Sequence, residues 1–110
     1  MFVAGKYPMT AKHNITAFIY DKKGNLLSMG KNSYEKTHPL QAKYAKDVGE
    51  DYKIFIHAEI HAIARCRDIN KAHKMVIMRY GRSGSPLLAK PCKICERALS
   101  FTNIKEVVHT

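Results

Sequence analysis

Two short motifs carry side chains that could bind a metal ion and move protons. His57 and Glu59 stand two positions apart, and Cys92 and Cys95 stand three positions apart directly after Pro91. One imidazole and two thiolates are zinc ligands, and a tetrahedral zinc ion held by three side chains keeps its fourth position open. A water molecule at that position has its pKa brought to about 7. The residue types therefore predict a catalytic zinc site.

The neighbouring titratable side chains are assigned by their spacing. Glu59 is close enough to His57 to reach a zinc-bound water, so we expect it to act as general acid and base. Cys66 lies about two helical turns beyond His57 and is expected to be a buried apolar side chain. The spacing of His57 and His61 around Glu59 does not match the His-Glu-x-x-His motif of zinc proteases. His61 is therefore expected to pack or hydrogen-bond behind the ligands.

The first half of the chain predicts an antiparallel hairpin. Residues Ile15–Tyr20 read as a short apolar strand, and Leu26–Gly30 read as a second strand. The sequence Asp-Lys-Lys-Gly-Asn between them is rich in turn-forming residues. Farther on, a short helix is expected around Gln41–Lys46.

The second half alternates helices with strands. A helix is predicted from His57 to about Asn70, because apolar residues recur at helical spacing there, and a mostly buried strand is predicted over Lys74–Tyr80. Pro91 suits the first position of a second helix that runs to about Phe101. Glu106–His109 reads as the last strand. This order predicts parallel crossovers, and hence an α/β fold with a mixed sheet opened by an antiparallel hairpin.

Such a fold would bring the two motifs together. Adjacent parallel strands place the helices that follow them at one edge of the sheet, so His57 and the two cysteines would converge. The positive end of a helix also lowers the pKa of a thiol, which favours the thiolates that zinc requires at Cys92 and Cys95.

The two motifs together match the signature of zinc-dependent deaminases. From about Asn14 to its C-terminus the chain resembles the cytidine and deoxycytidylate deaminase superfamily. The resemblance implies a three-layer α/β fold with a sheet of four to five strands, zinc ligation by His57, Cys92 and Cys95, and proton transfer by Glu59. It also implies ring contact through the Ala58 backbone. Asn32, in Gly30-Lys31-Asn32, matches the position of an asparagine that contacts substrate in the family.

The chain departs from the family at both ends. Family members usually have a helix before the first strand and further elements after the fourth, whereas only Met1 to His13 precede the predicted hairpin here. We therefore expect a neighbouring subunit to supply residues that close over the substrate, and hence a homo-oligomer.

The length and charge of the chain limit its partners. At 110 residues it predicts one domain over residues 1–110, and a net charge of +10 indicates an anionic partner, although a basic surface can also serve solubility alone. No apolar run reaches membrane-spanning length and no signal-peptide pattern opens the chain, so we expect a cytoplasmic protein without membrane contacts.

For two further sets of residues, the sequence leaves open whether they bind a substrate or have only a structural or solubilising role. Five basic residues could bind phosphate or simply be solvated: Lys31, Lys36, Arg79, Arg82 and Lys90. Four aromatic residues could stack on a base or fill the core: Tyr34, Tyr44, Phe55 and Tyr80.

Three functions are compatible with these features. The first is hydrolytic deamination of a cytosine nucleoside or nucleotide, of the deoxycytidylate kind, which suits a small domain with basic loops. The second is deamination of a base within single-stranded DNA or RNA, which the charge favours and which would need a basic groove leading to the metal. The third is a zinc-stabilised nucleic-acid-binding module without catalysis, against which Glu59 beside an open metal position argues.

Overall fold

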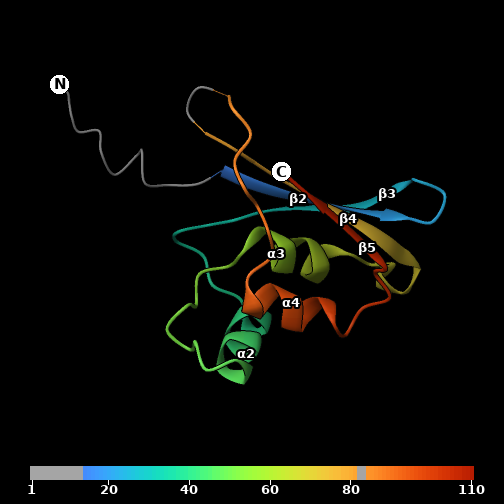
Figure 1. Cartoon of the computed structure of the whole chain (residues 1–110). Coiled ribbons are helices and arrows are strands. Elements are labelled where there is room, and N and C mark those ends of the chain that lie inside the picture. The colour runs from blue at the N-terminus through green and yellow to red at the C-terminus, as the bar shows by residue number, and fades with distance from the viewer. Residues whose placement is uncertain (1–13, 82–83) are drawn as a thin grey trace.

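The computed structural model describes residues 14–81 and 84–110, and within them a four-stranded mixed sheet forms the centre of the fold (Figure 1). The strands occur in the spatial order β3-β2-β4-β5. Their bounds are Asn14–Asp21 for β2, Leu26–Lys31 for β3, Ala72–Tyr80 for β4 and Glu106–His109 for β5. The predicted α/β class and all four predicted strands are therefore confirmed.

The predicted hairpin is β2 and β3, which pair antiparallel. Its turn is held by the Asp21 carboxylate, which accepts hydrogen bonds from the backbone N–H groups of Lys23 and Asn25 at 2.9 and 2.8 Å. Gly24 has a φ of +89°, a left-handed conformation that glycine adopts without strain. Local turn chemistry thus fixes the hairpin.

The predicted parallel crossover joins β4 to β5. Strand β4 pairs antiparallel with β2 and parallel with β5, and helix α4 (Lys93–Leu99) connects β4 to β5. The expectation that adjacent parallel strands precede both motif helices is wrong in one respect. Strands β3 and β4 run in the same direction, but β2 lies between them, because the hairpin strand pairs with both.

The helices differ from the predicted ranges at their ends. Helix α2 spans Pro39–Asp47 and begins earlier than expected, because the His38 ring accepts a hydrogen bond from the Leu40 N–H at 3.0 Å and caps the first turn. Helix α3 spans Ala58–Arg65 and ends earlier than expected.

The early end of α3 has a packing cause. Cys66 adopts an extended backbone after the helix, and a 3₁₀ turn over Ile69–Lys71 leads directly into β4. This path directs both Cys66 and Ile69 to the core cluster that contains β4, as the prediction of a buried Cys66 required.

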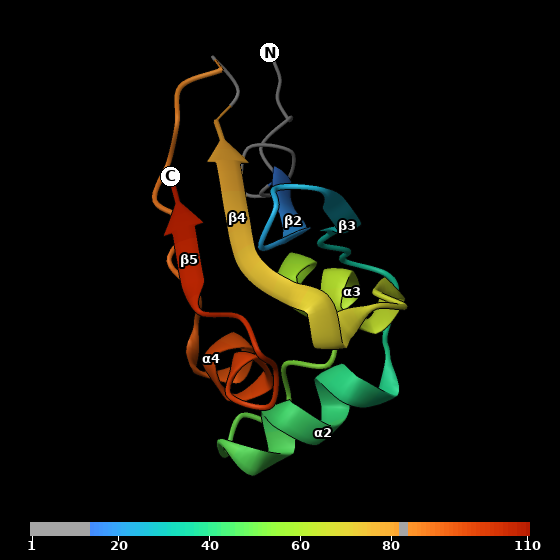
Figure 2. The same cartoon turned by 90° about the vertical axis from the view of Figure 1, so that its right-hand side faces the viewer.

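All three α-helices lie on one face of the sheet in the described ranges (Figures 1 and 2). The described residues form two layers, and the third layer that the resemblance implied is not seen among them. None of the described helices is long and apolar enough to cross a membrane.

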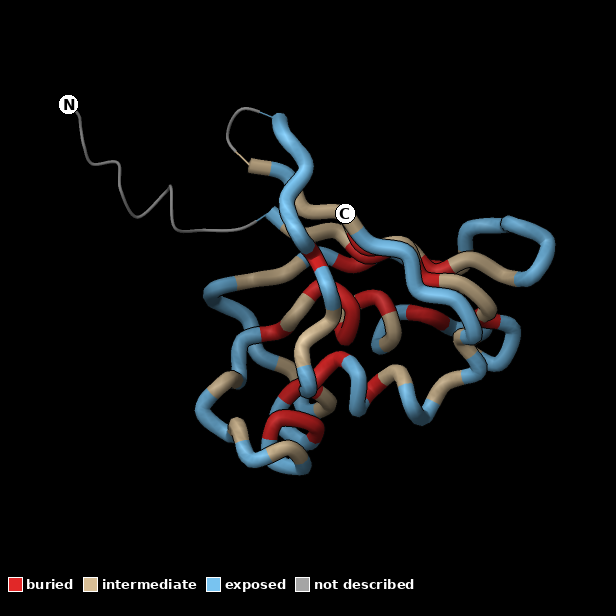
Figure 3. Tube along the Cα trace, in the orientation of Figure 1, coloured by how far each residue is buried: buried red, intermediate tan, exposed pale blue. Residues whose placement is uncertain are grey.

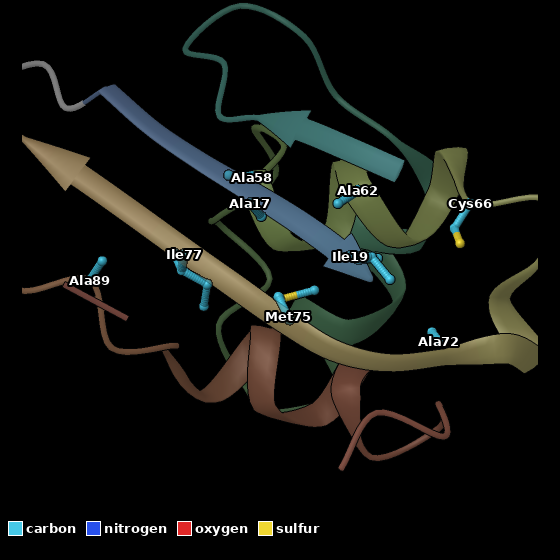
Figure 4. Close-up of a cluster of buried hydrophobic side chains, with 9 residues drawn as sticks. All are labelled: Ala17, Ile19, Ala58, Ala62, Cys66, Ala72, Met75, Ile77 and Ala89. Atoms are coloured by element: carbon cyan, nitrogen blue, oxygen red, sulfur yellow. The ribbon is translucent and has the colours of Figure 1, made fainter. Parts of the chain in front are cut away.

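Within the described residues, the core consists of two clusters of buried side chains. Figure 3 marks the buried residues in red along the chain trace, on strands and helices alike. The first joins the inward faces of β2 and β4 to α3, with Ile19, Met75 and Ile77 fully buried (Figure 4). The second joins α2, α3 and α4, with Ile60 and Ile94 at its centre. Cys95 belongs to the second cluster and Cys92 packs against it, while α3 contributes to both clusters.

Candidate metal centre

His57 stands at the start of α3 with its ring turned away from the helix. It is the N-cap residue, but its side chain makes none of the hydrogen bonds to first-turn N–H groups that N-cap side chains usually make. Its ring Nδ1 instead lies 3.5 Å from the Cys92 sulfur and 3.4 Å from the Cys95 sulfur. The side chain is thus directed at the second motif, as predicted.

The two cysteines occupy the first turn of α4. Cys92 is the N-cap and Cys95 lies three residues later, so both sulfurs face the same side. The expectation that Pro91 opens this helix is wrong. The helix begins at Lys93, because Cys92 has an extended backbone and takes the capping position, which leaves Pro91 one residue outside.

The three donor atoms fit a zinc ion. All of them lie within 4.8 Å of one another. Zinc–nitrogen and zinc–sulfur bonds of ordinary length in a tetrahedron separate a nitrogen from a sulfur by roughly 3.6 Å, close to the two distances found here. His57, Cys92 and Cys95 could therefore hold a metal ion, and among the described residues no other His, Cys, Asp or Glu joins this group.

Protons are shared among these donors. The pKa of Cys92 is lowered to about 3, chiefly because the Cys95 thiol and the His57 ring hydrogen-bond to its sulfur. The same hydrogen bond and deep burial raise the pKa of Cys95, and the hydrogen bond to Cys92 raises the pKa of His57. The helix N-terminus, which we expected to lower both thiol pKa values, is therefore not the main cause at Cys92, and the expectation is wrong for Cys95, whose pKa is raised. A cation bound here would displace these protons.

Glu59 lies in the first turn of α3 and is almost fully buried, with 6% of its surface exposed. Burial raises the pKa of its carboxyl group above the ordinary value, because a charged carboxylate is poorly solvated there. A carboxyl group in such surroundings can hold a proton closer to neutral pH, as a general acid and base requires.

A cavity of about 470 Å³ opens beside these residues and includes His57, Glu59 and Cys92 in its wall. Asn32 and Ala58, the predicted substrate contacts, also line it. The Asn32 side-chain oxygen accepts a hydrogen bond from the Ile15 N–H at 3.0 Å, which ties the end of β3 to the start of β2. That Asn32 and Ala58 contact a substrate stays a prediction.

The structure divides the basic and aromatic residues, whose roles the sequence left open, into those that line the cavity and those that do not. Tyr34, Phe55, Arg79 and Lys90 line the cavity, whereas Tyr44 is buried in the helical cluster. Lys31, Lys36 and Tyr80 do not line the cavity. Arg82 lies outside the described residues.

Three functional candidates escaped sequence reasoning. Tyr52 and Lys53 line the cavity from a loop without a motif. Gln41 is fully buried and bridges two backbones, since its Nε2 donates to the Lys53 carbonyl at 2.9 Å and its Oε1 accepts from the His57 N–H at 3.1 Å. Its helical spacing with Tyr44 and Ala45, which share its buried face, was the available signal.

His61 is not part of the metal-binding group among the described residues. Its ring Nδ1 lies 3.0 Å from the Lys31 backbone nitrogen, so it fastens α3 to the end of β3. This contact is of the hydrogen-bonding kind that we expected, but its partner is the backbone at the end of β3 and not a ligand side chain.

Comparison with known families adds one finding to this geometry. A family model described as the cytidine and deoxycytidylate deaminase zinc-binding region matches residues 3–110. No curated protein matches the sequence at a significant level.

Proposed function

The chain belongs to the cytidine and deoxycytidylate deaminase family, and from that premise we propose that it hydrolyses the exocyclic amine of a cytosine nucleoside or nucleotide, of the deoxycytidylate kind, to the uracil product and ammonia. The observation that carries this proposal is the buried Glu59 in the wall of the same cavity as His57 and Cys92.

The donor set favours catalysis over a structural role. A structural zinc site usually closes with four protein ligands. Here three donors come together in the described part of the chain, and two of them line a cavity large enough for a substrate. Zinc in such a three-ligand site supplies a nucleophile from water at neutral pH.

Glu59 would move the protons that the reaction requires. Its carboxylate takes one proton from the attacking water and passes it to the ring nitrogen beside the amine-bearing carbon, while the water oxygen forms a bond to that carbon. The carboxylate then takes the remaining proton of this oxygen and gives it to the amine nitrogen, so that the carbon–nitrogen bond breaks, the carbonyl forms and ammonia leaves. The raised pKa of Glu59 supports both halves of this exchange, because a carboxyl group whose pKa lies above its ordinary value takes up and keeps a proton more readily.

The rest of the cavity suits a nucleotide better than a free base. Lys53, Arg79 and Lys90 line it, and Glu59 is the only acidic side chain among those lining residues that the structure describes. A phosphate group would be attracted to this wall, whereas an uncharged base would gain nothing from it.

The proposal is tested with the zinc-loaded protein on cytidine, deoxycytidine, their monophosphates and the adenine counterparts, with ammonia release as the readout. We expect the cytosine compounds to react. Glu59→Gln should keep its zinc and its fold but lose about 10²- to 10⁴-fold in rate, the range typical of a missing acid–base group.

The matched control is Glu96→Gln, which changes an exposed glutamate in the first turn of α4 and should react like the unaltered protein. Near-normal rates for Glu59→Gln would remove the proton-transfer role. An absence of turnover on every compound tested would favour the non-catalytic zinc module.

A further inference from the structure

Gln41 is a buried polar side chain that the proposed reaction does not use. It lies on α2 outside the cavity wall, and none of its surface is exposed. It shares the buried face of the helix with Tyr44 and Ala45, which belong to the second core cluster. Burial of an amide is unfavourable unless both of its ends are hydrogen-bonded, whereas a methionine of similar size would pack here without that penalty. The amide is therefore expected to have a role that an apolar side chain cannot fill.

Two backbone groups fix the orientation of this amide. The Lys53 carbonyl can only accept, and it receives a hydrogen bond from the Gln41 Nε2 at 2.9 Å. The His57 N–H can only donate, and it gives a hydrogen bond to the Gln41 Oε1 at 3.1 Å. Glutamine is the side chain of this length that offers a donor and an acceptor from one planar group. A glutamate in its place would lose the first contact when ionised, and a methionine would lose both.

The contact with Lys53 holds one wall of the cavity. Tyr52 and Lys53 line the cavity from the loop between α2 and α3. Packing contributes little to this loop, since 72% of the Tyr52 surface and 40% of the Lys53 side chain are exposed. The Lys53 N–H donates to the Glu50 carbonyl at 2.9 Å, which is a contact within the loop itself. The bond from Gln41 instead fastens the loop to a helix, and so fixes where the wall stands.

The contact with His57 holds the backbone of a metal ligand. His57 is the N-cap of α3, where the backbone N–H has no partner within the helix. Its ring is directed at the sulfurs of Cys92 and Cys95. A metal ion would restrain this residue through its ring, and Gln41 restrains it through its backbone. The same amide thus touches the metal ligand at one end and the cavity wall at the other.

We infer that Gln41 is a positioning residue that joins His57 to the Tyr52–Lys53 wall of the cavity, so that a bound metal ion also orders the surface against which a substrate lies. The ion restrains His57, His57 restrains the Gln41 amide, and the amide holds the loop at the Lys53 carbonyl. Such coupling acts in both directions, so a substrate that contacts the loop should strengthen metal binding in turn. The link itself requires only the metal site, and its effect on a substrate rests on the proposed deamination.

Limited proteolysis with trypsin tests the link without any turnover. Cleavage after Lys53, located by mass spectrometry, reports opening of the loop, and cleavage after Lys43, an exposed residue within α2, reports opening of the helix. In the unaltered protein, zinc should protect Lys53 about three- to tenfold more than it protects Lys43, the change that one ordinary hydrogen bond provides. In Gln41→Met this additional protection should vanish, because both contacts of the amide are lost.

Tyr44→Leu is the matched control. Tyr44 lies on the same buried face of α2 and stacks on Phe101 with ring centres 5.8 Å apart, so this variant also loses packing. It leaves both hydrogen bonds of Gln41 in place and should keep the additional protection of Lys53 by zinc. If Gln41→Met kept that protection as Tyr44→Leu does, Gln41 would only fill space and the inference would be overturned.

A second measurement uses the unaltered protein, because Gln41→Met leaves two buried backbone groups without partners and could fail to fold. Gln41 is the only glutamine in the chain, so its side-chain N–H protons can be assigned in a nuclear magnetic resonance spectrum. These protons should exchange with water about threefold or more slowly with zinc bound than after chelation, since the ion holds the partner of the amide in place. Equal exchange rates in the two states, with zinc binding verified, would contradict the link.

Kinetics connects the link to the reaction. For deoxycytidine monophosphate, Gln41→Met should raise KM about three- to tenfold and change kcat by less than about twofold, because the wall is loosened while Glu59 and the metal donors remain. A lower kcat with an unchanged KM would mean that Gln41 acts on the chemistry and not on the wall, and would overturn the inference. Absence of turnover by the unaltered protein, with the proteolysis result as expected, would instead overturn the proposed deamination and leave the link standing.

Discussion

Glu59 shows how one residue can serve chemistry at the expense of stability. Its carboxyl group is buried at the first turn of α3, where burial raises its pKa from the ordinary value of 4.5. A raised carboxyl pKa means that the folded protein keeps a proton that the unfolded chain has already lost. Its contribution to the free energy of unfolding therefore falls as the pH rises above about 4.5, because the folded state binds the additional proton.

This pH dependence of the free energy of unfolding gives a prediction for the metal-free protein. After chelation, Glu59→Gln should be more stable than the unaltered protein at pH 7, by about 1 kcal/mol or more, since it removes a buried carboxyl group whose charged form is disfavoured by burial. The difference should shrink as the pH falls towards 4. Urea unfolding at several pH values measures it, with the exposed Glu96→Gln as the variant that should stay within about 0.5 kcal/mol throughout. A destabilised Glu59→Gln at pH 7 would mean that the carboxylate is well paired in the fold.

At the scale of elements, the site depends on the close contact between β3 and α3. Gly30 faces the helix, and a Cβ atom added there would lie within 2.8 Å of backbone atoms of Ala58, His61 and Ala62. The Ser28 hydroxyl on the same face donates to the Ala62 carbonyl at 2.7 Å. The glycine of the Gly30-Lys31-Asn32 sequence is therefore required for packing, and Asn32 reaches the cavity wall because β3 lies so near to the helix.

Gly30→Ala should consequently destabilise the protein by about 1–3 kcal/mol or more, the usual cost of overpacking, because backbone cannot move aside as a side chain can. The neighbouring Met29→Ala is the control, since Met29 is exposed and lies on the opposite face of the strand. Denaturant unfolding compares the two. An unchanged midpoint for Gly30→Ala would show that α3 can shift away from the sheet without loss.

The elements also show what sequence patterns could and could not predict. The hairpin, β4 and β5 follow from alternation, apolar runs and turn residues, which act locally. The end of α3 was predicted too late, because the helical pattern continues through Cys66 while the need to place Ile69 in the core ends the helix. The strand order depends on how β2 pairs on both sides, and no local pattern states that pairing.

Some residues of the site could likewise be predicted from the sequence and others could not. The metal-binding group was predictable because ligand chemistry restricts the residue types and their spacing. Gln41, Tyr52 and Lys53 were not. Tyr52 and Lys53 lie in a loop that tertiary hydrogen bonds bring to the cavity, and Gln41, on helix α2, makes one of those bonds to the Lys53 carbonyl. A buried glutamine can be suspected from a helical pattern, but its partners lie more than ten residues away in the chain.

At the scale of the whole molecule, the two cysteines of the metal centre lie in or against the helical cluster, and α3, which His57 caps, contributes to both core clusters. Helix α4 belongs to the cluster that it forms with α2 and α3, and the sheet belongs to the other. His57 on α3 and the two cysteines on α4 would be joined by one ion, so the metal would tie the helical cluster to the helix that covers the sheet. A domain of 110 residues has a small stability margin, and such a link contributes a large share of it.

Removal of zinc should therefore destabilise the molecule unevenly. With zinc at about a hundred times its dissociation constant, binding adds about 2.7 kcal/mol, and chelation should lower the unfolding midpoint by roughly 10 °C. Hydrogen exchange should show the greatest loss of protection in α2 and α4 and the smallest in β2 and β4, because the sheet keeps its own buried cluster with α3.

Two cysteine variants test the same point. Cys92→Ser, measured with zinc present, should contain little metal and reproduce the chelated protein, whereas Cys66→Ser should keep its zinc, since Cys66 lies in the sheet cluster. Protection lost equally from strands and helices would mean that the metal stabilises the fold as one unit, and full zinc content in Cys92→Ser would remove Cys92 from the ligand set.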